Sequence, residues 1–383
     1  MAKASQTDLA VYIHWPYCTR ICPYCDFNVY KTRADESLVE AICVDLKHWR
    51  QWGGPRRVGS IHFGGGTPSL LSPAEIAQIL TQICALWDVA RDCEIALEAN
   101  PNDANAKRWE GYARAGVNRL SLGVQSFHGP ALKRLGRDHS GAEAKAALRL
   151  ATEIFPRISA DVIYGWAGQD EALLRQDLEA LLDKGIGHIS AYQLTIEDGT
   201  AFGRAEARGD IKAVDADTSA GFYDFVRGEL LAAGFAHYEV SNFAKTGESS
   251  HHNLAYWQGR DYVGVGPGAH GRMTIDGVRY ATITAMKPQA YQTRIGTDNN
   301  GIEELTALTP QAWGEEYVLM GLRIDDGIAL PRYTEITGKA LPQDIIDTLI
   351  GDGLLEQKNT RLMASAQGRI VLNRLTDMLL LSD

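Results

Sequence analysis

The chain has 383 residues, of which 45% are hydrophobic and 22% charged, a balance typical of a globular protein with one large domain and a smaller one. Its 38 basic and 48 acidic residues give a formal net charge of −10, which argues against a general binder of nucleic acids or anionic membranes. No apolar stretch reaches transmembrane length and residues 1–10 lack the apolar core of a signal peptide, so we expect a cytoplasmic protein, not an integral membrane protein, with reduced thiols.

Short β-branched runs alternate with amphipathic stretches through the first half of the chain, which is the pattern of βα units around a parallel sheet. We expect six strands, over residues 9–14, 58–63, 93–99, 117–124, 158–164 and 188–195. The expected helices are 35–52, 72–87, 104–115, 141–154 and 171–184. In barrels of this type the chemistry collects at the C-terminal ends of the strands.

Three cysteines, Cys18, Cys22 and Cys25, follow the first expected strand and offer three thiolates without an obvious fourth ligand. A structural zinc site usually has four closed ligands, and a thioredoxin-like pair of Cys22 and Cys25 would leave Cys18 without a role. An iron-sulfur cluster with one iron left open uses all three thiols, and we favour this reading over the other two. The remaining cysteines, Cys43, Cys84 and Cys93, are isolated in apolar periodic runs and are expected in the core.

Polar and glycine-rich residues stand at the ends of the next four strands. The run Gly64-Gly-Gly-Thr-Pro68 either lets the backbone approach a ligand or forms a tight βα turn, and it lacks the lysine of a P-loop. Glu98 is either a solvated strand end or an acceptor for ribose hydroxyls or an amino group. Three further polar residues indicate a binding site only if they form one ring around it: Gln125, Arg137 and Asp161.

Beyond residue 300 we expect a helix over 308–323, a helix over 345–350, a hairpin over 353–362 and a helix over 368–380. Residues 310–383 hold seven basic and eleven acidic side chains, a charge that would repel nucleic acid. We therefore divide the chain into a barrel over 1–240, a connecting region over 241–300 and a C-terminal domain over 301–383.

Six segments together resemble the radical S-adenosylmethionine superfamily, in its oxygen-independent coproporphyrinogen oxidase group. They are Tyr12-Ile-His-Trp-Pro-Tyr-Cys18, the three cysteines, Gly-Gly-Gly-Thr-Pro, Glu98-Ala-Asn-Pro, Gly123-Val-Gln-Ser-Phe127 and Asp161-Val-Ile-Tyr-Gly165. The resemblance implies an α/β fold: a partial (βα)6 TIM-like barrel with a small winged-helix-like C-terminal domain. It also implies a 4Fe-4S cluster on the three cysteines, with S-adenosylmethionine on the open iron.

The same resemblance assigns the cofactor contacts. It implies that Tyr12, Gly66 and Glu98 contact the cluster-bound S-adenosylmethionine and that Tyr24 lies near its adenine. It implies that Thr67, Gln125, Arg137 and Asp161 hold a second S-adenosylmethionine.

Two departures from the oxidases indicate a branch within the group. Phe27 stands where coproporphyrinogen dehydrogenases carry a further cysteine, and the segment His252-Asn-Leu-Ala-Tyr-Trp257 resembles a motif of the haem chaperones of the HemW branch. The branch implies that His252, Asn253, Tyr256 and Trp257 bind haem. His251, His252 or His270 could supply the axial imidazole, and the motif could instead simply pack a loop onto the barrel.

We therefore expect a haem chaperone whose partners are haem, haem-requiring acceptor proteins and, if radical chemistry occurs, an electron donor. The alternative is an oxygen-independent coproporphyrinogen III dehydrogenase. A ferredoxin-like electron carrier would not explain so large a barrel. The sequence assigns no catalytic residue and leaves open whether the chain dimerises.

Overall fold

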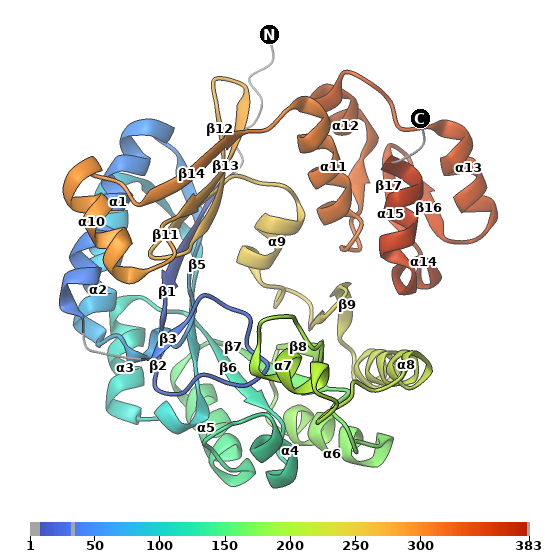
Figure 1. Cartoon of the computed structure of the whole chain (residues 1–383), viewed down its shortest axis with the longest axis horizontal. Helices are drawn as coiled ribbons and strands as arrows, with labels where there is room; N and C mark the ends of the chain where they lie inside the picture. The colour runs from blue at the N-terminus through green and yellow to red at the C-terminus, as the bar shows by residue number, and fades with distance from the viewer. Residues whose placement is uncertain (1–7, 32–34, 381–383) are drawn as a thin grey trace.

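The computed structural model describes residues 8–31 and 35–380, so the expectation for residues 1–10 falls mostly outside the described part. A 12-stranded sheet organises the larger part of the chain, in the order β14-β13-β12-β11-β1-β4-β5-β6-β7-β8-β10-β9. The sheet curves around an interior that holds a short helix, and most other helices cover its outer face (Figure 1). None of the helices in the described ranges has both the length and the apolar composition needed to cross a bilayer.

The parallel half of the sheet contains all six strands that the sequence predicts. They are β1 (Leu9–Trp15), β4 (Arg57–Gly65), β5 (Asp88–Ala99), β6 (Arg119–Gln125), β7 (Arg157–Tyr164) and β8 (His188–Gln193). Neighbouring strands pair in parallel, for example Val11 with Ile61 and Leu120 with Ile158. Such strands are nearly continuously buried because both faces of the sheet are covered, and β1 shows this pattern.

The crossover helices confirm the predicted βα alternation. The helices of this part are α1 (Glu36–Gly53), α2 (Pro73–Leu86), α3 (Ala106–Ala115), α4 (Gly129–Arg134), α5 (Gly141–Ile154), α6 (Glu171–Leu182), α7 (Ala201–Ala207) and α8 (Ala216–Ala232). At the start of α2, Ser72 and Glu75 form a reciprocal capping box, which fixes where that helix begins. Cys43 and Cys93 are buried as expected, but Cys84 is exposed, so the prediction for that residue was wrong.

Residues 236–307 add strands that the sequence analysis did not foresee. They are β9 (Ala236–Glu239), β10 (Asn242–Ala244), β11 (Tyr262–Val265), β12 (His270–Ile275), β13 (Val278–Thr284) and β14 (Ile302–Ala307), with α9 (His251–Trp257) and α10 (Pro288–Asp298) between them. The strand β11 pairs in parallel with β1, whereas β12 to β14 continue as an antiparallel meander. The region 241–300 is therefore part of the same sheet.

The C-terminal domain has its own hydrophobic core and contains the predicted helix, helix, hairpin and helix. Its elements are α11 (Pro310–Gly321), β15 (Ile328–Ala329), α12 (Leu330–Thr337), α13 (Gln343–Gly351), β16 (Leu355–Lys358), β17 (Arg361–Ala364), α14 (Ala366–Ile370) and α15 (Leu372–Leu380). The domain lies beside α9 and β9 (Figure 1). Arg323 joins it to the barrel through an ion pair with Glu239 at 2.7 Å and a cation–π contact with Trp257 at 4.6 Å.

Candidate functional site

The three clustered cysteines line a single cavity of about 360 Å³. Two short strands, β2 (Tyr17–Cys18) and β3 (Tyr30–Lys31), pair with each other and fix the two ends of the cysteine segment. Cys18 is buried, and its sulfur accepts a hydrogen bond from Thr67 Oγ1 at 3.5 Å; Cys22 and Cys25 are half-buried. Burial raises the pKa of the Cys25 thiol to about 11, so a bound metal must displace its proton.

The ligand geometry bears on the kind of metal site. Within residues 8–31 and 35–380, no three His, Cys, Asp or Glu side chains converge closely enough to hold a single metal ion. This does not match a preformed structural zinc site, whose ligands meet at one ion. A cluster several ångströms across needs its thiolates further apart, around a cavity like this one.

Seven of the eight residues to which the family resemblance assigns a cofactor role line the cavity of the cysteines. They are Tyr24, Gly66, Thr67, Glu98, Gln125, Arg137 and Asp161. Most of them come from the C-terminal ends of β4 to β7 or the loops that follow, as expected for a barrel of this type. The eighth, Tyr12, lines a neighbouring cavity instead, whose lining includes Glu98 as well.

The cavity contains buried polar groups that have no hydrogen-bond partner among the described residues. Gln125 Oε1 and Arg137 Nε are buried without a hydrogen bond in the described part of the chain. A buried polar atom left unpaired costs about 1–3 kcal/mol, which a bound polar ligand would relieve. Gln125 also adopts a left-handed backbone conformation with φ of 64°, and such strain in a non-glycine residue is concentrated at functional sites. These residues fit a polar, zwitterionic cofactor.

Charge is distributed unevenly around the cavity. Arg137 is held by the carbonyl of Gly123 at 2.9 Å and by Asn100, and it donates to the Cys22 sulfur at 3.5 Å. Burial and the charge of Glu98 raise the pKa of Asp161 to about 7. The cavity therefore has a cationic side at the cysteines and an acidic side at Glu98 and Asp161.

The glycine run brings the end of β4 against the cysteine segment. Gly66 N donates to Trp15 O at 2.7 Å, and Thr67 N donates to Tyr17 O at 2.8 Å. A Cβ atom on Gly66 would lie 2.7 Å from Tyr17 O, so no larger residue fits there without a backbone shift. The glycine is thus required by close backbone packing next to the cysteines.

The motif 252–257 forms α9 inside the curved sheet, next to a second cavity of about 500 Å³. Tyr256 and Trp257 line this cavity together with His270. His252 is only 2% exposed and does not line it; its ring stacks on His62 at 4.7 Å, and its Nε2 lies 2.7 Å from Tyr256 Oη. Of the other motif residues, Asn253 is half-buried, whereas His251 is exposed.

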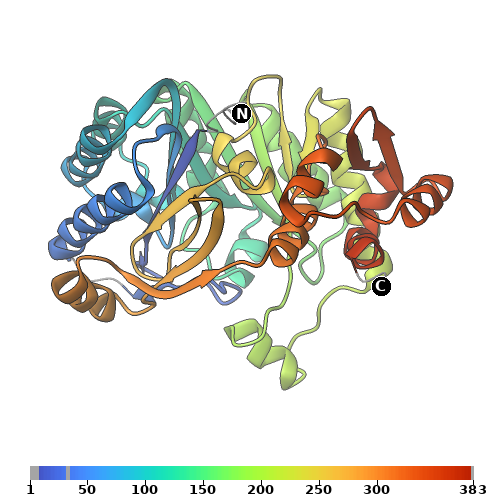
Figure 2. The same cartoon turned by 90° about the horizontal axis from the view of Figure 1, so that it is seen from above.

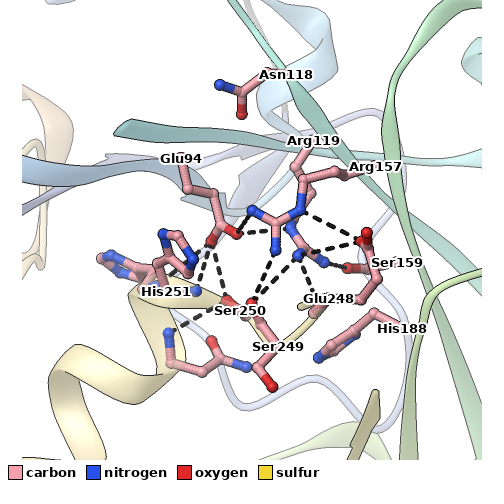
Figure 3. Close-up of polar contacts among 12 residues, drawn as sticks. Glu94, Asn118, Arg119, Arg157, Ser159, His188, Glu248, Ser249, Ser250 and His251 are labelled. Atoms are coloured by element: carbon pink, nitrogen blue, oxygen red, sulfur yellow. Dashed lines mark hydrogen bonds and ion pairs between the residues drawn. The ribbon is translucent and has the colours of Figure 1, made fainter. Parts of the chain in front are cut away.

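A buried polar network holds the start of α9 (Figure 3). Glu94 on β5 accepts hydrogen bonds from the backbone N–H groups of His251 at 2.9 Å and His252 at 3.4 Å. Its other oxygen lies 2.9 Å from Arg119 Nε and 3.0 Å from Arg157 Nη1. The carboxylate thus compensates the two arginines and also caps the positive end of the helix.

Two residues of this region were not among the predicted site residues: Glu94 and His62. His62 Nε2 donates to Glu98 Oε1 at 2.9 Å, and its ring stacks on that of His252. A signal existed for both residues. Each is a polar residue within a predicted strand, where the alternation of side chains turns it toward the barrel interior.

Comparison with known proteins places the chain in a family. The sequence profile of the radical SAM superfamily matches residues 12–181, and that of the HemN C-terminal domain matches residues 308–371. The chain is 36% identical to the heme chaperone HemW of Escherichia coli over 97% of this chain and 98% of the relative. It is 37% identical to the mouse mitochondrial protein named radical S-adenosyl methionine domain-containing protein 1, over 97% of this chain and 87% of that protein.

The solved structure of the coproporphyrinogen III oxidase HemN of Escherichia coli has the same fold. Its TM-score is 0.82, and the match covers 99% of this chain and 91% of HemN at 20% sequence identity. This likeness extends from the barrel through the C-terminal domain and confirms the predicted fold class. With these matches, the chain belongs to the radical S-adenosylmethionine superfamily, in the family that includes the HemW proteins.

Proposed function

We propose that this protein is a haem chaperone, which binds haem and passes it to haem-requiring proteins. One observation carries the proposal: an aromatic-lined cavity of about 500 Å³, with an accessible histidine, lies next to the cavity of the cysteines. Relatives that match over nearly the whole chain and are named heme chaperones support it. Its partners are then haem and the acceptor proteins; the cytoplasmic location stays a prediction, because other relatives are named as mitochondrial.

In this proposal Cys18, Cys22 and Cys25 hold a 4Fe-4S cluster, and S-adenosylmethionine binds beside it. When bound, the cluster supplies a low-potential electron and one iron open to a chelating ligand. Arg137 and Gln125 offer unpaired polar atoms to a cofactor in this cavity. The carboxyl groups of Glu98 and Asp161 offer hydrogen-bond acceptors. Tyr24 provides a flat surface, and Thr67 orients the Cys18 sulfur.

Haem itself is placed in the second cavity, against Tyr256 and Trp257. Of the three candidate histidines, His270 is the one that is exposed and lines this cavity. Burial and the nearby charge of Arg272 lower the pKa of His270, which favours the neutral imidazole that binds iron. His252 and Asn253 then act by holding α9 and the Tyr256 hydroxyl in place.

Titration of the full-length protein with haem under anaerobic conditions tests this assignment. We expect one haem per chain, and we expect His270→Ala to weaken haem binding at least tenfold and to change the Soret spectrum, because the axial ligand is lost. His251→Ala is the matched control and should bind haem like the unmodified chain. His252→Ala should weaken binding without changing the ligand spectrum. Loss of the spectrum in His252→Ala alone would contradict the assignment to His270.

The alternative activity is coproporphyrinogen III dehydrogenation, and Phe27 argues against it. Phe27 is 61% exposed and lines both cavities, and by the family resemblance it takes the place of the cysteine that the dehydrogenases carry. Incubation with coproporphyrinogen III, reductant and S-adenosylmethionine should therefore give no decarboxylated product.

A further inference from the structure

The outer side of the cysteine segment forms a third hollow, separate from the two cavities described above. Its volume is about 550 Å³, and it shares four lining residues of the cysteine segment with the inner cavity: Arg20, Ile21, Cys22 and Cys25. The cysteine segment is thus a thin wall, with the candidate cofactor cavity on one side and this outer hollow on the other. A protein bound in the hollow would approach the cysteines without entering the barrel.

Four exposed cationic side chains line the hollow: Arg20, Lys133, Arg134 and Arg204. None of them has an ion-pair partner within residues 8–31 and 35–380. Arg134 and Arg204 donate only to carbonyl oxygens, those of Ala167 and Gly199. Among the described residues that line the hollow none is acidic, although the chain as a whole carries a net charge of −10.

The hollow is held by packing between the cysteine segment and two helices. Gly136, just after α4, lies so close to Pro23 that a Cβ atom there would come within 2.5 Å of the proline ring. Phe202 N, in α7, donates to Pro23 O at 2.8 Å. Figure 2 shows α7 and its flanking loops extending away from the sheet, and Arg204 on this helix is exposed. Ile21, which is 47% exposed, adds an apolar contact among the cations.

We propose that this basic hollow is the docking surface for an acidic protein that carries single electrons and reduces the cluster. An apolar contact surrounded by unpaired charges of one sign suits a transient partner, whose encounter is steered by opposite charge. In the step, the reduced carrier loses one electron and the cluster gains one, and no bond forms or breaks. The inference rests on the proposed function only in requiring a cluster on the cysteines.

Binding of an acidic plant-type [2Fe-2S] ferredoxin to the full-length protein tests the proposal. Oxidised ferredoxin is used first, so that binding is measured without electron transfer. We expect saturable binding that weakens at least tenfold between low and physiological salt, because exposed charges are screened. Reduced ferredoxin is then mixed with the cluster-loaded protein, and reduction of the cluster is followed by electron paramagnetic resonance.

The decisive variant is Lys133→Glu with Arg204→Glu, because both side chains are exposed, neither lines the cavity of the cysteines and neither makes an ion pair in the described residues, so the fold should not change. It should lose ferredoxin binding and slow reduction by ferredoxin at least tenfold, while dithionite still reduces its cluster at the original rate. The matched control is Lys107→Glu, an exposed cation on α3, which should behave like the unmodified protein.

Two outcomes would overturn the proposal. One is that the double variant binds ferredoxin as tightly as the unmodified protein. The other is that the hollow binds RNA and does not bind ferredoxin. Failure of the proposed function is seen separately. If iron and sulfide analysis finds no cluster, that function fails, while binding of oxidised ferredoxin still decides whether the hollow recognises an acidic carrier.

Discussion

At the scale of single residues, the surroundings of two buried carboxyl groups raise their pKa values. Asp45 on α1 accepts hydrogen bonds from the Tyr291 hydroxyl at 2.7 Å and from Gly301 N at 3.2 Å. Burial nevertheless raises the pKa of Asp45 to about 7, as it does for Asp161. A neutral carboxyl group is the form that costs least when it is removed from water.

The stability of the protein should therefore fall as the pH rises. The stabilising contribution of a carboxyl whose pKa is raised on folding is complete below its unfolded pKa of about 4, and it is lost as the pH rises to about 7. For Asp45 the loss is on the order of 2 to 4 kcal/mol. Asp45→Asn should reduce the slope of the unfolding free energy between pH 4 and 7, measured by urea denaturation.

The matched control for this prediction is Glu40→Gln, which changes an exposed carboxylate on the same helix. It should leave the slope unchanged. A slope in Asp45→Asn as steep as in the unmodified protein would show that Asp45 is ionised in the fold. In Asp45→Asn we expect a smaller pH dependence of the unfolding free energy to remain, because the pKa of Asp161 is also raised.

At the scale of elements, α9 depends on a network that lies far from it in sequence. The helix has seven residues, too few to be stable by itself, and its start is held by Ser250 and by Glu94. Glu94 is fully buried with Arg119, and Arg119 also donates to Ser159 Oγ at 2.8 Å and Glu248 O at 2.7 Å. The orientation of Tyr256 thus depends on charges in β5, β6 and β7.

Glu94→Gln should loosen α9 and destabilise the fold. The substitution leaves Arg119 and Arg157 buried without their main counter-charge, and breaking a buried pair costs about 3 to 5 kcal/mol. Hydrogen exchange should accelerate at the amides of residues 251–257 more than at those of α2. Glu110→Gln, which removes an exposed pair with Arg114 at 3.5 Å, is the control and should cost about 0.5 kcal/mol or less. Equal exchange in α9 and α2 would contradict the role of Glu94.

The sequence predicted the elements whose pattern is strong and missed those whose pattern is weak. The six buried strands and their crossover helices were found because hydrophobic residues repeat clearly in them. The strands β11 to β14 were missed because β11 is four residues long and β14 is largely exposed, so neither has a clear alternation. The residues at the strand ends were identified correctly as neighbours, since parallel strands bring their ends together.

The placement of the haem motif could not be read from its spacing. In α9 the residues His252 and Tyr256 are four apart and therefore share a helix face, and their side chains hydrogen-bond to each other. His252 is enclosed, whereas Tyr256 lines a cavity. This difference depends on Tyr12, His62 and β11, which are distant in sequence. Only the fold brings these together.

At the scale of the whole molecule, the C-terminal domain contributes to the second cavity. Glu316 and Met320 of α11 line it, and Glu316 binds Arg272 at 2.7 Å and Arg279 at 3.4 Å. The guanidinium group of Arg323 lies over the ring of Trp257, which also lines this cavity. The domain therefore helps to enclose the cavity.

Arg323→Ala should weaken haem binding without unfolding either domain. The variant loses the ion pair with Glu239 and leaves that buried carboxylate without its partner, and Trp257 loses the cation that packs on its ring. Haem titration should show weaker binding by about one order of magnitude, which corresponds to 1.4 kcal/mol. Lys358→Ala, which breaks an exposed pair within the C-terminal domain, should bind haem normally. If Arg323→Ala binds haem as tightly as the unmodified protein, the contacts of Arg323 at the domain interface do not contribute to haem binding in the cavity.

Asp26, Phe27 and Glu98 line both the cavity of the cysteines and the aromatic cavity. Asn28, the next residue, anchors this shared partition by donating to Pro267 O at 3.0 Å and Met286 O at 2.8 Å. A ligand that shifts the partition from one side changes the shape available on the other. By thermodynamic reciprocity, if a ligand bound at the cysteines changes the affinity for the macrocycle by some factor, then the bound macrocycle changes the affinity of the cysteine cavity for that ligand by the same factor.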